Sequence, residues 1–175
     1  MRRDHSSNVR QFGIKIEQGT AAPQSMVHAW EKAMQQGNEA FAQNEDQRAL
    51  QQYQTALKQA QSLLRECIQN NQSLMAIDTA FAAYVVSHHN LASVYARKGD
   101  LNTAALRLCE VHRCLSCICK DASLAAPLRE AAQRHGRRTY SELLNFSHLY
   151  SQHPLVAKTL RHCGQFCMEQ GRSLH

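Results

Sequence analysis

Cysteine is the residue type most able to do chemistry in this sequence, and most of its cysteines lie in two short segments. Residues 109–119, CEVHRCLSCIC, hold four of the seven, and residues 162–167, HCGQFC, hold two more. A structural zinc ion needs four ligands that converge in a tetrahedron, commonly as two pairs from different segments. Two pairs with helical spacing meet that need if their helices are neighbours: Cys114, Cys117, Cys163 and Cys167. The alternative is that these thiols are small core side chains, as free cysteine usually is.

Catalytic signatures are missing from the sequence. It contains no phosphate-binding loop, HExxH pair, nucleophile elbow or paired carboxylates with the spacing that such sites need. His88 and His89 are adjacent on an expected helix, so their rings point about 100° apart and are poorly placed to chelate one metal ion. We therefore expect a protein that is not an enzyme and that needs no cofactor.

Charge and composition limit the expected partners. The formal net charge is +6, and much of the excess lies in residues 1–15 and in Arg134, Arg137 and Arg138. Such a diffuse excess supports only weak, salt-sensitive attraction to polyanions, and no nucleic-acid-binding motif accompanies it. No apolar run approaches the ~20 residues of a membrane span, and residues 1–26 lack the apolar centre of a secretory signal. These features indicate a cytoplasmic protein with reduced cysteines, without a nucleic-acid or membrane partner.

The elements that must position these residues are helices. Only three prolines and seven glycines occur in 175 residues, and apolar residues recur at three- and four-residue spacing. Polar corners separate the apolar stripes, which predicts an all-α protein of about six antiparallel helices in three hairpins. The hairpins are expected at about residues 27–68, 74–119 and 124–170. Residues 1–25 lack the periodicity and are expected to form a flexible arm before a single domain, residues 26–175.

Two of these hairpins share a sequence pattern. Residues 37–57, GNEAFAQNEDQRALQQYQTAL, and 92–111, ASVYARKGDLNTAALRLCEV, each hold a small residue, an aromatic three or four positions later, a corner, and alanine with a large apolar residue. This pattern resembles the tetratricopeptide repeat, which implies a right-handed stack of helix pairs. The layout also resembles a small family of bacterial proteins of unknown function. Gly37 and Ala92 are 55 positions apart instead of the family's 34, which predicts unusually long second and third helices.

The resemblance also implies a ligand. In tetratricopeptide domains the first helix of each pair lines a groove that holds peptides or partner helices. By position, the groove residues here are Glu31, Met34, Gln35, Asn38, Phe41, His89, Asn90, Ser93 and Arg97. Asn38 and Asn90 stand where one branch of the family clamps acidic peptide ends, although Met34 replaces a clamp lysine. Arg134 and Arg138, four residues apart on one helical face, could supply the missing charge. The alternative for both asparagines is helix-corner chemistry and solvent contact.

Two classes of function remain open. The first is a non-enzymatic adaptor or chaperone that binds a peptide in the groove, a class that includes the small helical-repeat chaperones of secretion systems. The second is a self-associating structural protein, because an incomplete stack leaves an apolar face that a homodimer buries.

Overall fold

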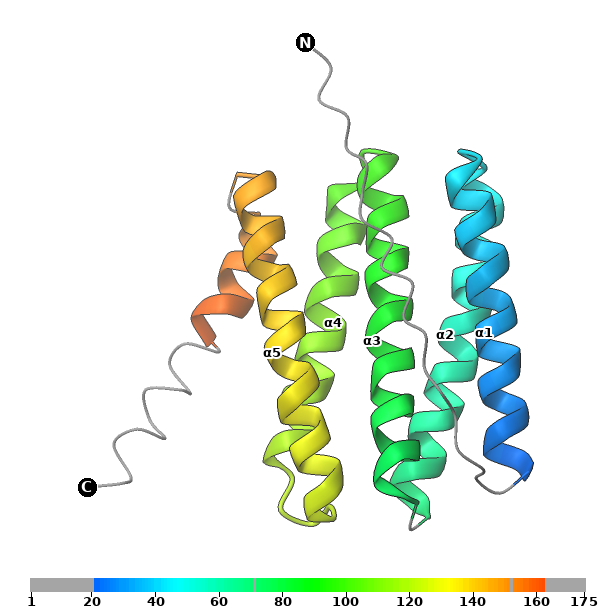
Figure 1. The fold of residues 1–175 in the computed structure, drawn as a ribbon. Coiled ribbons are helices and arrows are strands. Elements are labelled where there is room, and N and C mark those ends of the chain that lie inside the picture. Colours follow the sequence, from blue (N-terminus) through cyan, green and yellow to red (C-terminus); the bar gives the residue numbers. More distant parts are fainter. Residues whose placement is uncertain (1–20, 71, 152, 163–175) are drawn as a thin grey trace.

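The chain forms a row of long helices joined by short turns. The computed structural model describes residues 21–70, 72–151 and 153–162. Five helices span α1 (Ala21–Ala42), α2 (Asp46–Gln69), α3 (Leu74–Arg97), α4 (Leu101–Lys120) and α5 (Ala126–Leu149). A further helical segment covers residues 154–162. Figure 1 shows the helices side by side in chain order, from α1 in blue to the last segment in orange.

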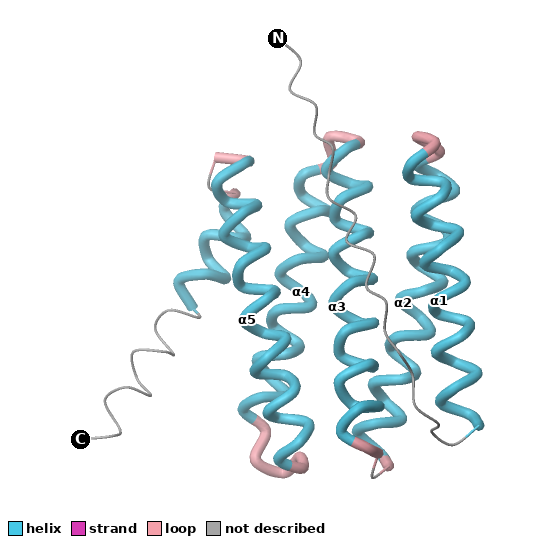
Figure 2. Tube along the Cα trace, viewed as in Figure 1, coloured by secondary structure: helices cyan, strands magenta, loops and turns pink. Residues whose placement is uncertain are grey.

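The all-α hairpin stack expected from the sequence is confirmed. The described residues contain helices and turns and no strand (Figure 2). Each helix packs against the next one in the chain, and α3 also packs against α1 and α5. Helix α3 therefore lies between α1 and α5. These three helices belong to three different hairpins, so side chains from all three hairpins can lie on one face of the molecule.

The first two hairpins turn in the same way. Asn44 and Gly99 both have a positive φ, 59° and 80°, which glycine and asparagine adopt at low cost at helix ends. The next residue in each case closes the turn: Glu45 N–H donates to Ala40 C=O, and Asp100 N–H donates to Tyr95 C=O, both at 2.9 Å. These equivalent positions are 55 residues apart, as are Gly37 and Ala92. The backbone therefore repeats with the same offset as the sequence pattern.

The start of the first helix differs from the expected one. Residues 21–25 were expected in the flexible arm, but α1 begins at Ala21, because alanine favours helix and a proline is tolerated in a first turn. The second and third helices are long, as expected, with 24 residues each, and α1 has 22, α4 has 20 and α5 has 24. These five helices are similar in length because neighbours in an antiparallel row must match in length to bury each other's apolar stripe. Residues 1–20, the rest of the expected arm, lie outside the described residues.

The core follows the seams between helices in two clusters. The larger joins α1, α2 and α3 to α4 and the first half of α5, with Trp30, Tyr53, Phe81, Leu91 and Leu115 among its buried side chains. The smaller joins the first half of α4 to the second half of α5 and the last helical segment. Its members are Ala92, Ala104, Ala105, Leu108, Cys109, Leu143, Phe146 and Val156. The small alanines allow α3 and α4 to approach closely near their shared corner.

Candidate interaction face of α1, α3 and α5

One side of α3 is left uncovered by its neighbours. Five side chains on that side recur at three- and four-residue spacing and are half-buried or exposed, whereas the flanking positions on α3 are buried. We call these residues the α3 stripe: Ala82, Val86, His89, Asn90 and Ser93. Asn90 hydrogen-bonds α1, and Asp78, one turn before the stripe, hydrogen-bonds α5. The stripe therefore runs along α3 between α1 and α5.

Two asparagines form the border between the α3 stripe and α1. Asn90 Nδ2 donates to Asn38 Oδ1 at 3.3 Å, and the Tyr53 hydroxyl of α2 donates to the same oxygen at 2.8 Å. Burial raises the pKa of Tyr53 to about 12, although the Asn90 side chain and the charge of Arg97 act in the opposite direction. Asn38 and Asn90 are thus brought together, and with Tyr53 they join three helices.

Arg97 has an intramolecular role that sequence comparison could not show. Its guanidinium donates to the Phe41 carbonyl at 2.8 Å, forms an ion pair with Asp46, and lies 3.5 Å from the centre of the Phe41 ring. It also approaches Asn44 Oδ1 at 3.4 Å. Arg97 therefore satisfies the Phe41 carbonyl near the end of α1 and ties α3 to the α1–α2 corner. Three of its five N–H donors are used in these contacts, and its role towards a ligand stays a prediction.

Met34 is not a groove residue, in contrast to the expectation from its position. Only 7 % of its surface is exposed, and its sulfur lies 3.9 Å from Ser87 Oγ in the α1–α3 contact. Trp30, one turn earlier, donates from Nε1 to the same hydroxyl at 3.0 Å. Met34 shares the buried side of α1 with Trp30 because a four-residue spacing places two side chains on one face. A clamp residue at this position would have no access to a ligand.

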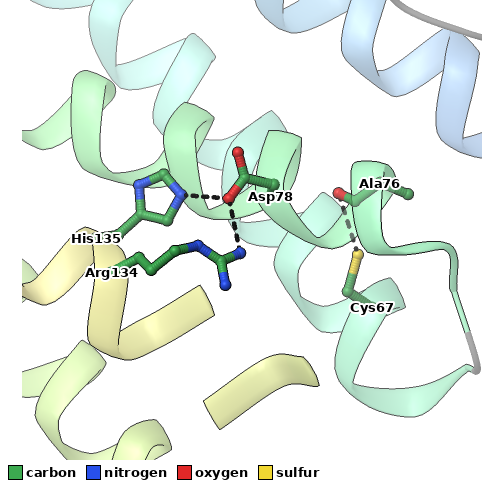
Figure 3. A network of polar contacts seen from close by, with 5 residues as sticks. All are labelled: Cys67, Ala76, Asp78, Arg134 and His135. Atoms are coloured by element: carbon green, nitrogen blue, oxygen red, sulfur yellow. Dashed lines mark hydrogen bonds and ion pairs between the residues drawn. The ribbon is translucent and has the colours of Figure 1, made fainter. Parts of the chain in front are cut away.

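The two arginines of α5, Arg134 and Arg138, lie in different environments. Arg134 donates to Asp78 Oδ1 at 3.1 Å, and His135 Nε2 lies 3.1 Å from the same oxygen (Figure 3). Burial acts to raise the pKa of Asp78, but hydrogen bonds from Arg134 and His135 outweigh it and lower the pKa. Arg138, one turn later, is half-buried and close enough to His89 to influence its charge. Arg134 and Arg138 therefore border the α3 stripe on the α5 side, with Arg134 held by Asp78.

The two histidines of α3 are buried to different degrees, His88 fully and His89 in part. His88 is fully buried and its ring lies 4.7 Å from the Tyr84 ring, edge to face. Burial first, and then the positive charge of Arg107, lower the pKa of His88 to about 4. Burial, Arg138 and His88 in turn lower the pKa of His89 to about 3. Both imidazoles are therefore neutral at physiological pH.

The cysteines are spread over different environments. Cys109 is buried, Cys114 is half-buried and Cys117 is exposed. Burial raises the pKa of Cys114, and its hydrogen bond with the Tyr84 hydroxyl lowers it by less. Of the four residues in the zinc hypothesis, Cys163 and Cys167 lie outside the described residues. Within 21–70, 72–151 and 153–162, no three His, Cys, Asp or Glu side chains are grouped so as to hold a metal ion.

Sequence reasoning missed some residues of this face. Ala82 and Val86 extend the α3 stripe towards Asp78, and Tyr53 reaches the Asn38–Asn90 border from α2. The first two could have been found by continuing the spacing of His89, Asn90 and Ser93 one and two turns back along the helix. Tyr53 could not, because its contact with Asn38 depends on how α2 packs.

Comparison with known proteins gives one family match for this chain. A family model described as "Protein of unknown function (DUF2753)" matches residues 28–172. The chain belongs to the DUF2753 family. No curated protein and no solved structure matches this DUF2753 chain. In the described part of the chain, no helix combines the length and the apolar character that crossing a membrane requires.

Proposed function

We propose that this DUF2753 protein is a non-enzymatic interaction module of the cytoplasm that binds a peptide or a partner helix along the α3 stripe. The observation that carries the proposal is the position of the stripe, between α1 and α5, on a face to which three hairpins contribute. The tetratricopeptide resemblance supports the same face, because it assigns ligand contacts to the first helix of each pair.

The chemistry of the α3 stripe suits an extended or helical ligand. Ala82, Val86 and Ser93 have small side chains, which allow a second backbone to approach closely. Asn90 and Asn38 carry amide groups at the α1 border. Each amide has more donors and acceptors than the hydrogen bond between the two residues uses. A partner helix or peptide would therefore find a small apolar floor with polar edges, the arrangement that peptide grooves use.

The geometry favours this general mode over a clamp for a terminal carboxylate. Of the residues that such a clamp would need, Met34 is buried and Arg97 binds the α1–α2 corner. Arg134 is paired with Asp78. We therefore propose recognition along the length of a ligand and not at its end.

The decisive experiment introduces a large charged side chain on the α3 stripe and at a matched place on the outer side of α2. Ser93 and Thr55 are both exposed helical residues whose hydroxyls donate to the carbonyl four positions earlier, at 3.0 Å each. A photo-crosslinking probe is placed at Gln35 on α1. Ser93→Arg is expected to abolish the crosslinks between this probe and partner proteins, and Thr55→Arg is expected to leave those crosslinks unchanged. Equal crosslinking by both variants, at equal thermal stability, would contradict binding on this face.

Self-association is the second candidate, and one surface feature favours it. Ile68, Leu74 and Met75 lie within eight residues at the α2–α3 corner and are 38 %, 69 % and 44 % exposed. A second copy of the chain would bury this apolar corner. Light scattering distinguishes the candidates: a dimer that Leu74→Glu converts to monomer, and Leu149→Glu does not, supports self-association. Leu149 is the matched control because it is 66 % exposed at the end of α5.

A further inference from the structure

His88 is an unusual residue for the centre of a helical stack. It has no exposed surface, and neither ring nitrogen has a hydrogen-bond partner of normal geometry. Leaving a buried polar atom unpaired is unfavourable. The backbone of Arg107 on α4 favours the protonated ring, and it offsets burial only in part.

His89 also has a buried ring nitrogen without a hydrogen-bond partner, its Nε2 atom. The adjacent positions of the two histidines turn their rings in different directions around α3. The pair is therefore within reach of charges on both of the helices that follow α3: Arg107 of α4 acts on His88, and Arg138 of α5 acts on His89.

The charged groups around the pair make protonation costly. The two that act on the rings are the arginines just named, and they are positive. Glu110 is the carboxylate on this part of α4, and it is already bonded to Arg107, with Nη1 and Oε2 2.9 Å apart. Tyr84, on α3 itself, contacts His88 through its ring edge and does not titrate in the acid range. A proton on either imidazole would thus add positive charge to a ring with a buried, unpaired nitrogen that already lies within reach of an arginine.

We propose that His88 and His89 form an acid-sensitive joint, which holds α3 against α4 and α5 when neutral and releases these contacts when protonated. The sign follows from linkage: a histidine whose pKa is lower in the folded state stabilises the fold fully above its unfolded pKa of about 6.5. That contribution is lost as the pH falls below 6.5 towards the folded values of about 4 and about 3. His89 also belongs to the α3 stripe, so the joint would regulate the binding face; that last step rests on the proposed function, whereas the joint itself does not.

Amide hydrogen exchange of the full chain, without any ligand, tests the joint. After correction for intrinsic rates, moving from pH 7 to pH 5 is expected to reduce protection in α3, α4 and α5 and to spare the middle of α2. The single tryptophan gives a second readout, because Trp30 donates to Ser87, the neighbour of His88. Its fluorescence is expected to change over the same pH range while far-ultraviolet circular dichroism stays helical.

Variants separate the joint from general acid sensitivity. The midpoint compared is the pH at which half of the amide protection in α3 is lost. The double variant His88→Leu/His89→Leu is expected to lower this midpoint by at least about one pH unit, since the two histidines with lowered pKa values are then absent. His28→Gln, at an exposed position on α1, is expected to keep the wild-type midpoint. The proposal is overturned if the double variant keeps that midpoint. If the double variant does not fold, nuclear magnetic resonance titration of the wild-type rings decides: a ring that titrates near pH 6.5 without loss of amide protection also overturns it.

Discussion

The ring of Tyr53 on α2 lies directly against Gly37 on α1. A β-carbon at position 37 would be 2.5 Å from Tyr53 Cε1 and 2.6 Å from Cδ1, closer than real atoms approach. Tyr53 cannot swing away freely, because it is buried and its hydroxyl is bonded to Asn38. Gly37 is therefore the residue that sets the distance between α1 and α2.

Gly37→Ala is expected to destabilise the protein by about 1–3 kcal/mol, the usual cost of overpacking. Gly136→Ala is the matched control, since a β-carbon at this position in α5 meets nothing within 4 Å. That variant is expected to gain up to about 1 kcal/mol, because alanine is the better helix former. Urea unfolding of both variants measures the difference, and a Gly37→Ala protein as stable as the Gly136→Ala protein would disprove the close contact.

Arg97→Ala is expected to cost about 1–2 kcal/mol, because it removes hydrogen bonds to the α1–α2 corner and the contact with the Phe41 ring. Arg97→Lys should recover only part of this loss, since a single ammonium group cannot reach Phe41 and Asp46 with the same geometry. Arg48→Ala serves as the control, because its ion pair with Glu45 is largely exposed and worth little. Thermal unfolding compares the three; equal melting temperatures for Arg97→Ala and Arg48→Ala would refute the structural role.

Asp78→Asn is expected to destabilise the protein by less than about 1 kcal/mol at pH 7, because its ion pair with Arg134 is half-exposed. The pKa of Asp78 is lowered from 3.8 in the folded protein, so its carboxylate stabilises the fold above that pH. This contribution of the carboxylate to stability should disappear as the pH falls below 3.8 and then below the lowered pKa of Asp78 in the folded protein. Urea midpoints of wild type and variant are therefore expected to differ by the same amount at pH 7 and pH 6. A difference that changes between pH 7 and pH 6 would contradict this assignment to the Asp78 carboxylate.

Local patterns were enough to predict the helices and their corners. The spacing of apolar residues marks the helical faces, Gly99 marks the end of α3, and Asp100 caps α4 by accepting from Thr103 N–H at 3.0 Å. The same reasoning placed His89, Asn90 and Ser93 on one side of α3, because a helix determines which residues share a face. It did not place Met34, because the groove assignment followed the tetratricopeptide resemblance and not the apolar character of methionine, which favours burial.

Sequence by itself therefore determined which segments are helical, where they turn, and which side chains of α3 lie in one stripe. Tertiary structure alone decided that Arg97 serves the α1–α2 corner, that Tyr53 joins Asn38 and Asn90, and that His88 has no hydrogen-bond partner. The physical reason is range. Helix periodicity and capping act between residues a few positions apart, whereas Arg97 and Phe41 are 56 positions apart in sequence. Their contact exists only after the hairpins have packed.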